Sequence, residues 1–135
     1  EQLRMKPQGE SVSRRRRPRT LMFQEPWLGA IDRGDKTTEI RLADSAFARS
    51  ASVGDVFNGK SQERCISLEI TGVEFFDSFG DAWVGLGPAM GVDSVFSKPS
   101  HSKVQKLYED CFYRGRSFPP EKGSVVAVHV RKVRG

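Results

Sequence analysis

The segment RCISLEITGVEFF, residues 64–76, limits the possible folds more than any other part of the chain. Ile66, Leu68 and Ile70 alternate with more polar residues, and this period of two predicts a β-strand whose two faces differ in polarity. Gly72 then interrupts the alternation, which predicts a bulge or bend in the strand. This segment is therefore the clearest strand candidate in the chain.

Four further segments predict strands, because each is short and either apolar or rich in β-branched residues. They are residues 20–23, residues 36–42, the residues that follow a tight turn at 53–55, and residues 123–133. In the last segment Val126, Val128 and Val130 lie on one face, while Val125, Ala127, His129 and Arg131 lie on the other. The first segment, TLMF, has the apolar composition of a buried strand.

Two segments predict helices. Pro26 suits the first turn of a helix, Trp27 and Ile31 lie at helical spacing after it, and Gly34 predicts a left-handed end. The segment 102–115 also places its apolar residues at helical spacing: Val104, Leu107, Tyr108, Cys111 and Phe112. The glycine-rich residues 79–93 support no assignment.

These elements predict one small α+β, mostly β domain. A chain of 135 residues is long enough for one core and too short for two ordinary domains. About five short strands with two or three short helices favour a mostly antiparallel, partly closed β-barrel, because closure removes exposed sheet edges. We expect the barrel domain to span residues 21–135 and to follow an arm of residues 1–20 that is disordered or ordered by RNA.

The positive charge of the chain is concentrated in this arm. Residues 1–20 contain seven basic and two acidic residues, whereas the other 115 residues contain fifteen of each, so the net charge of +5 belongs to the arm. Arginine forms bidentate hydrogen bonds with phosphate, which predicts contacts with RNA phosphates. A nuclear import signal and simple solubilisation remain alternatives. The predicted phosphate-binding residues are Arg14, Arg15, Arg16, Arg17 and Arg19.

The composition argues against metal, cofactor and membrane binding. The two cysteines, Cys65 and Cys111, lie far apart, and no cluster of Cys and His has the spacing of a zinc site. We therefore expect free thiols in a reducing intracellular compartment; an organellar matrix such as that of mitochondria, the cytoplasm and the nucleus all remain open. No apolar run approaches the ~18 residues of a membrane span. The first residue, Glu1, is compatible with removal of an organellar presequence.

Residues 23–41 contain the pattern F-x-x-P-W-x-x-x-I-x-x-G-x-K-T-x-E-x-R. This pattern resembles the signature of the ASCH domain family, which belongs to the PUA-like β-barrels. The downstream VGD at 53–55, the YEDCFY helix at 108–113 and a final apolar strand follow in the order of the family. The resemblance covers about residues 21–133. It implies a barrel with a cleft beside the first helix that is suited to RNA or a nucleoside.

Seven residues are candidates for this cleft: Trp27, Lys36, Thr37, Thr38, Glu39, Arg41 and Tyr108. Trp27 is a candidate platform on which a base stacks. Lys36 is interpreted either as a contact to phosphate or a carbonyl, or as an ordinary solvated lysine. Glu39 and Arg41 share a strand face, where they form either an ion pair that orients a base or a purely structural pair. His129, which alternates with valines, is predicted to be a structural residue.

The resemblance implies two possible activities. Small bacterial members of the family remove the acyl group of acetylated cytidine with a lysine, a threonine three residues later and a separate carboxylate. Here Lys36 is present, but Glu39 occupies the threonine position and Asp93 is the only acid where the family has glutamate. We therefore predict a non-catalytic RNA-binding module that binds structural or ribosomal RNA and neighbouring proteins in a ribonucleoprotein such as a ribosome. The alternative is an amidohydrolase that uses Lys36 and Glu39.

Overall fold

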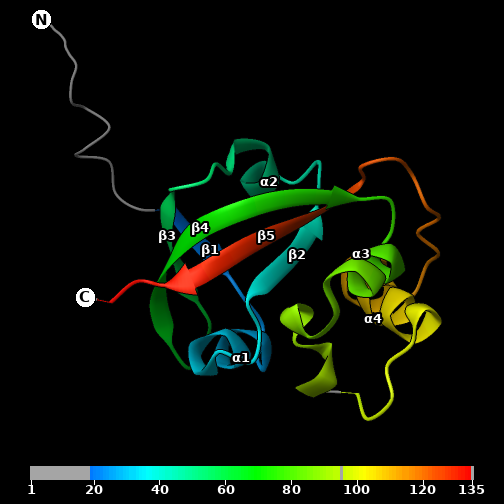
Figure 1. Ribbon diagram of the computed structural model, residues 1–135, viewed down its shortest axis with the longest axis horizontal. Coiled ribbons are helices and arrows are strands. Elements are labelled where there is room, and N and C mark those ends of the chain that lie inside the picture. The colour runs from blue at the N-terminus through cyan, green and yellow to red at the C-terminus, as the bar shows by residue number, and fades with distance from the viewer. Residues whose placement is uncertain (1–18, 95, 135) are drawn as a thin grey trace, which may run out of the picture.

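The computed structural model describes residues 19–94 and 96–134, which form one curled five-stranded sheet flanked by helices (Figure 1). The strands are β1 (Arg19–Met22), β2 (Thr38–Leu42), β3 (Val56–Lys60), β4 (Cys65–Phe76) and β5 (Val125–Lys132). Their order across the sheet is β1-β3-β4-β5-β2. β1 pairs with β3 in parallel, and the other neighbours are antiparallel. The predicted α+β class with five strands is confirmed.

Helices cover both sides of this sheet. They are α1 (Trp27–Arg33), α2 (Ala46–Ser50), α3 (Phe79–Leu86) and α4 (His101–Tyr113), with short 3₁₀ turns η2 (Gly87–Met90) and η3 (Val92–Ser94). Figure 1 shows α3 and α4 together on one side of the sheet, whereas α1 and α2 lie at opposite ends of the half-barrel. Among the described residues, none of the helices has the length and apolar character needed to cross a bilayer.

The sheet separates two hydrophobic cores. The inner core lies under α1 and α2 and contains Phe23, Leu28, Ile31, Ala48, Phe57, Leu68, Ile70, Val126, Val128 and Val130. The outer core lies under α3 and α4 and contains Ile40, Phe79, Ala82, Met90, Val92, Val104, Tyr108, Val125 and Ala127. β5 contributes to both cores with alternate residues, which confirms the two faces predicted from its valine pattern.

The helix end predicted at Gly34 and the strand bulge predicted at Gly72 are both present. Gly34 ends α1 at φ 86°, in the left-handed region. The pairing of β4 with β5 shifts register between Ile70 and Gly72, which is the bulge predicted from the sequence. A Cβ atom on Gly72 would lie 3.1 Å from Cδ2 of His129, so glycine also makes room for that ring.

β1 differs from the buried strand expected at residues 20–23. It begins at Arg19, two residues before the expected start of the domain, and its residues are alternately half-buried and exposed. The side chain of Met22 is 60% exposed. The reason is that β1 is an edge strand, since it pairs with β3 but does not pair with β2 among the described residues. The sheet is therefore a half-barrel with two open edges, and Arg19 and Thr20 belong to it.

Two α-helices, α2 and α3, were not anticipated, so the described residues contain four α-helices rather than two or three. Each begins at a serine whose side chain accepts a backbone hydrogen bond, from Ala48 in the case of Ser45 and from Asp81 in the case of Ser78. α3 contains two glycines, which weaken its intrinsic helix propensity, and it is stabilised by burial of Phe79 and Ala82 in the outer core.

Replacing Gly34 with alanine is expected to lower the free energy of unfolding by about 1 kcal/mol, because an L-residue is disfavoured at φ 86°. No described atom lies within 4 Å of the added carbon, so the backbone conformation is the only cost. Gly34→Asn is the matched control and should lose less stability, since asparagine tolerates this conformation. Urea unfolding measures both variants, and an alanine variant as stable as the wild type would contradict the prediction.

Candidate functional site

A pocket of about 250 Å³ lies between the edge strands β1 and β2, the start of α1 and the middle of α4. It is lined by Met22, Phe23, Gln24, Trp27, Lys36, Glu39, Ile40, Arg41, Tyr108, Cys111 and Phe112. These residues come from segments far apart in the sequence, and the pocket forms because the half-barrel does not close between β1 and β2. Polar side chains from β2 and aromatic side chains from the two helices therefore face the same space.

Lys36 is the most unusual residue of the pocket, because its side chain is almost completely buried at 2% exposure. Its Nζ donates a hydrogen bond to the carbonyl of Met90 at 2.7 Å, and it lies 3.8 Å from Oε1 of Glu39. The ammonium also lies 5.1 Å from the centroid of the Trp27 ring. The alternative of an ordinary solvated lysine is therefore wrong.

Burial lowers the pKa of Lys36 from its ordinary 10.5 to about 8, because removal from water disfavours the charged form. The carboxylate of Glu39 opposes this effect by raising the pKa, and the guanidinium of Arg41 adds to it by lowering the pKa. The stem of Lys36 packs against Gly91, where a Cβ atom would lie 2.7 Å from the Cβ of Lys36. Met90 at the end of η2 and the following Gly91 thus cover part of this side chain.

Glu39 and Arg41 form an ion pair inside the pocket. Nε of Arg41 lies 2.7 Å from Oε2 of Glu39, and Nη2 of Arg41 donates to the carbonyl of Met22 at 3.0 Å. The guanidinium also lies 5.3 Å from the centroid of the Phe23 ring. Arg41 therefore connects the two sheet edges across the pocket, while Glu39 lies between two cations.

Tyr108 and Trp27 supply the aromatic surface of the pocket. Their ring centroids are 6.4 Å apart with an interplanar angle of 23°, and Tyr108 also stacks on Phe79 at 5.2 Å. The pKa of Tyr108 is raised by burial and by the nearby carboxylate of Glu39. Its hydroxyl has no hydrogen-bond partner within residues 19–94 and 96–134, so it is available to a bound molecule.

Solved structures with the same architecture include hypothetical protein PH0355, which is 20% identical with a TM-score of 0.67 over 87% of this chain and 100% of that chain. The ASCH domain from Lactobacillus crispatus JV V101 is 17% identical with a TM-score of 0.59 over 90% of this chain and 83% of that domain. This chain has the ASCH fold. The resemblance inferred from residues 23–41 is thus confirmed at the level of the fold.

Protein PF0455 from Pyrococcus furiosus also shares the ASCH fold of this chain. It is 19% identical with a TM-score of 0.59 and covers 88% of this chain and 100% of its own. The structural similarity to these proteins establishes a common fold, but the sequence identity is too low to establish a common activity. No protein-family model matches the sequence, and no curated protein matches it significantly.

The ASCH fold brings five of the seven predicted cleft residues into the pocket: Trp27, Lys36, Glu39, Arg41 and Tyr108. Thr37 and Thr38 are not among the residues that line it. The backbone N–H of Thr37 donates to Ala89, and its side chain is exposed. Oγ1 of Thr38 lies 2.8 Å from Nδ1 of His129. Thr38 lies opposite His129 of β5 in the pairing register, and its side chain contacts that ring and not the pocket.

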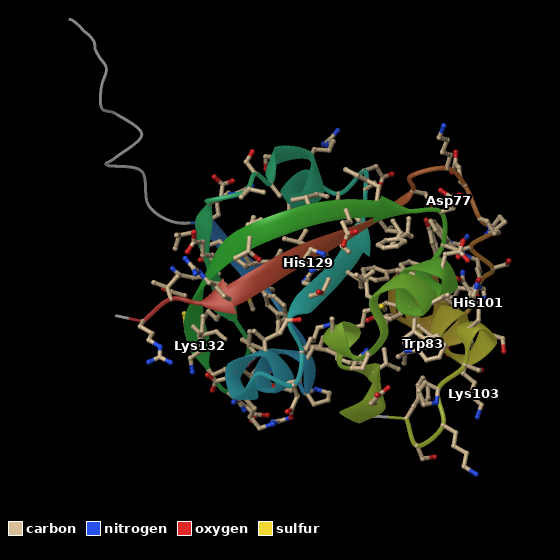
Figure 2. All side chains as sticks on the ribbon, in the orientation of Figure 1. Asp77, Trp83, His101, Lys103, His129 and Lys132 are labelled. Atoms are coloured by element: carbon tan, nitrogen blue, oxygen red, sulfur yellow. The ribbon has the colours of Figure 1, made fainter. Side chains whose placement is uncertain are left out.

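His129 is a partnered strand residue, as its place among the valines of β5 predicted. Figure 2 shows it on β5, in the middle of the sheet. Its Nδ1 contacts Thr38, and its Nε2 lies 2.6 Å from Oε1 of Glu74. These three side chains join β2, β5 and β4 beside the bulge, and none of the three lines the pocket.

Several pocket residues were not predicted: Met22, Gln24, Ile40, Cys111 and Phe112. Cys111 and Phe112 lie three and four residues after Tyr108 on α4, so helical spacing would have placed them on the same face. Met90 and Gly91, which hold Lys36, have no comparable signal in the sequence. Asp93, the acid considered as a possible catalytic carboxylate, is exposed in η3 and does not line the pocket.

The predicted phosphate-binding arm is only partly described. Arg14, Arg15, Arg16 and Arg17 lie outside the described residues. Arg19 belongs to β1, where its guanidinium hydrogen-bonds Oγ of Ser50, lies 3.7 Å from Oδ2 of Asp55 and packs over the Phe47 ring. Its assignment to a free arm is therefore wrong, because these contacts tie it to the domain.

The described residues were also considered as possible metal ligands and redox-active thiols. Residues 19–94 and 96–134 contain no group of three or more His, Cys, Asp or Glu side chains that could hold a metal ion. Cys65 and Cys111 are free, exposed thiols. Glu39 is the one carboxylate among the residues that line the pocket.

A titration of Lys36, followed by the NMR signal of its Cε, is expected to have its midpoint near pH 8. Glu39→Gln should lower this midpoint, because it removes the carboxylate that stabilises the ammonium, whereas Arg41→Gln should raise it. The two variants are expected to shift the pKa of Lys36 in opposite directions. A midpoint near 10.5, as for a solvated lysine, would contradict the burial of the amine.

Proposed function

We propose that this protein is a non-catalytic RNA-binding module that holds one unpaired nucleotide in the pocket between β1 and β2. The size and lining of the pocket carry this proposal. Its volume of about 250 Å³ is below the ~300–1,000 Å³ of pockets for drug-sized ligands, so the pocket would hold the nucleotide by its base alone. Trp27 and Tyr108 offer aromatic surface for a base, and stacking of this kind contributes ~1–3 kcal/mol.

The charges of the pocket support an anionic or polar ligand. Lys36 and Arg41 are two cations beside the single carboxylate of Glu39, and all three line the same cavity. Below about pH 8 the pocket therefore carries a net positive charge, which favours a ligand with a phosphate. Water is largely excluded around Lys36, so its interactions are stronger than at the surface.

The arginine-rich arm supplies the second part of the proposal. The domain after residue 20 has equal numbers of basic and acidic residues, so it has little general attraction for a polyanion. Arg14–Arg17 would instead bind phosphates and hold the RNA close to the pocket. A neutral domain with a basic arm also suits a subunit held by neighbouring proteins in a ribonucleoprotein, for instance a ribosome.

Two variants should separate the arm from the pocket in binding to a short single-stranded RNA. Deletion of residues 1–18 is expected to weaken binding and to reduce the slope of log affinity against log salt by about 3, at ~0.7 per phosphate contact. Trp27→Ala is expected to lower affinity by ~1–3 kcal/mol with little change in that slope. Fluorescence anisotropy at several salt concentrations measures both effects.

Phe75→Ala is the matched control for Trp27→Ala, because it removes an aromatic side chain that is 59% exposed and does not line the pocket. It should bind RNA like the wild type. Thermal unfolding of each variant checks that the domain remains folded. RNA affinity that is unchanged by both the arm deletion and Trp27→Ala would refute the proposal.

A second candidate function is hydrolysis of an acylated nucleoside, and one observation favours it. The lowered pKa of Lys36 makes its neutral amine accessible near pH 8, and Oε1 of Glu39 lies 3.8 Å from this amine. Two contacts speak against it. The amine donates to the carbonyl of Met90, and Glu39 is held by Arg41, so neither group is positioned freely for proton transfer.

Incubation with N4-acetylcytidine distinguishes the two functions. Hydrolysis adds water to the acyl carbon, breaks its bond to nitrogen and yields acetate and cytidine. We expect no release of acetate above background. Release by the wild type that is lost in Lys36→Ala, with the fold retained, would establish the hydrolase and overturn the non-catalytic proposal.

A further inference from the structure

The charges of the domain are divided unevenly along the chain. Residues 21–97 contain six basic and twelve acidic residues, whereas residues 98–134 contain nine basic and three acidic residues. The net charges of these two parts are therefore −6 and +6. Although the domain as a whole is neutral, its last part attracts anions.

The cations at the end of β5 are already paired with the acidic part of the domain. Nη2 of Arg131 lies 2.8 Å from Oε1 of Glu69, and Nζ of Lys132 lies 2.7 Å from Oδ1 of Asp32. The remaining positive charge is concentrated in α4 and in the segments before and after it. The basic residues there are Lys98, Lys103, Lys106, Arg114, Arg116 and Lys122.

The exposed side of α4 presents several of these cations to solvent. Val104 and Tyr108 are buried and define the side of the helix that faces the core. Lys103, Lys106 and Arg114 are exposed, and Arg114 directly follows the last residue of the helix. Figure 2 shows Lys103 on the outer side of α4, away from the sheet.

Most of these cations are not neutralised by a carboxylate. Nζ of Lys103 donates to the carbonyl of Lys98 at 3.1 Å, and Nε of Arg116 lies 3.4 Å from the carbonyl of Tyr113. Neither contact removes a charge. Within the described part of the chain, four of the cations form no ion pair: Lys98, Lys103, Arg114 and Arg116.

The two acidic residues of α4 leave this excess of charge in place. Oδ1 of Asp110 lies 3.0 Å from Nζ of Lys106, so Asp110 offsets that one cation. The carboxylate of Glu109 accepts from the N–H of Phe118 at 2.8 Å and from Nε2 of Gln105 at 3.1 Å. Glu109 is therefore engaged with the segment that follows the helix.

The line of cations passes the opening of the pocket. Residues 103, 107 and 111 are four apart, and Arg114 comes three residues after Cys111, so these residues lie along one side of α4. Cys111 is exposed and lines the pocket between β1 and β2. Lys103 and Arg114 therefore lie on the two sides of the point where α4 meets the pocket.

We infer that the exposed side of α4 is a second phosphate-binding surface, formed by Lys98, Lys103, Arg114 and Arg116, for the nucleotides that flank the base in the pocket. This inference rests on the proposed RNA binding. Lysine binds phosphate as a point charge, and arginine donates two parallel hydrogen bonds to it. The surface is separate from the arginines before residue 19, and it directs the strand across the pocket opening.

An acidic protein is the competing partner for this surface. Protein interfaces depend on apolar or aromatic side chains that are buried on contact. The large hydrophobic side chains exposed on the described part of the domain are Met22, Val53, Val56, Phe75, Val84 and Val133, and none of them belongs to α4. Exposed cations without an apolar centre fit the phosphate backbone of a nucleic acid better.

The test measures binding of the full chain to a short single-stranded RNA of mixed sequence at several salt concentrations. The double variant Lys103→Gln with Arg114→Gln should weaken binding and reduce the slope of log affinity against log salt by about 1.4, at ~0.7 per phosphate contact. Fluorescence anisotropy gives the affinities. Thermal unfolding checks that the domain is still folded.

Arg49→Gln with Arg134→Gln is the matched control, because it removes the same charge from two exposed residues without an ion pair in the described chain. Arg49 lies in α2 and Arg134 lies beside the C-terminus, and Figure 1 shows both regions well apart from α4. The control should keep the slope of the wild type. A loss of slope that came only from the lower net charge would be equal in the two double variants.

Lysine footprinting tests the same surface without any substitution. Acetylation of the wild-type chain, followed by mass spectrometry, should modify Lys98 and Lys103 at least about twofold more slowly when RNA is bound. This measurement stands even where the double variant fails to fold.

The outcomes separate this inference from the proposed function. If the wild type does not bind RNA, the proposed function fails and the inference fails with it. If RNA binds but the two double variants have equal slopes, or if bound RNA leaves Lys98 and Lys103 equally reactive, RNA binding stands and the role of α4 is overturned. An acidic protein that protects these lysines where RNA does not would also overturn it.

Discussion

Burial of β5 on both faces is the constraint on which the rest of this structure depends. Val126, Val128 and Val130 fill the inner core, while Val125 and Ala127 fill the outer core. The helices α3 and α4 must cover the outer face, and the half-barrel must curl over the inner one. Apolar side chains fill both faces of β5, whereas polar and charged side chains line the pocket at the end of the sheet. The pocket beside β2 lies at that end.

The pocket also concentrates interactions that reduce stability. A buried ammonium is costly unless it is paired, and Lys36 has one carbonyl and one carboxylate close to it. Glu39 also forms an ion pair with Arg41, so its single negative charge is divided between two cations. Because Lys36 binds its proton less tightly in the folded chain, stability rises as the pH increases from about 8 to 10.5. Such a cost at one site is typical of a functional site.

Within the proposed function, the arm and the pocket have different tasks. Contacts to phosphate provide affinity and position a protein on a nucleic acid, whereas contacts to bases provide specificity. In this chain the two kinds of group are separated along the sequence, with the arginines before residue 20 and the pocket after it. A domain without net charge has little general attraction for a polyanion. In the proposed function, the arm and neighbouring proteins in an assembly would hold the RNA near the pocket.

The sequence by itself determined the local elements of this protein. The period of two in β4 and β5, the left-handed end of α1 at Gly34 and the bulge at Gly72 follow from side-chain alternation and backbone sterics, which act between near neighbours. The motif at residues 23–41 also placed Lys36, Glu39 and Arg41 close together. Only the tertiary structure decided the burial and the contacts of these residues. The burial of Lys36 depends on Met90, 54 residues away, and the open edge of β2 depends on which strands pair. Solvent exposure and strand pairing arise from long-range packing, which no local pattern encodes.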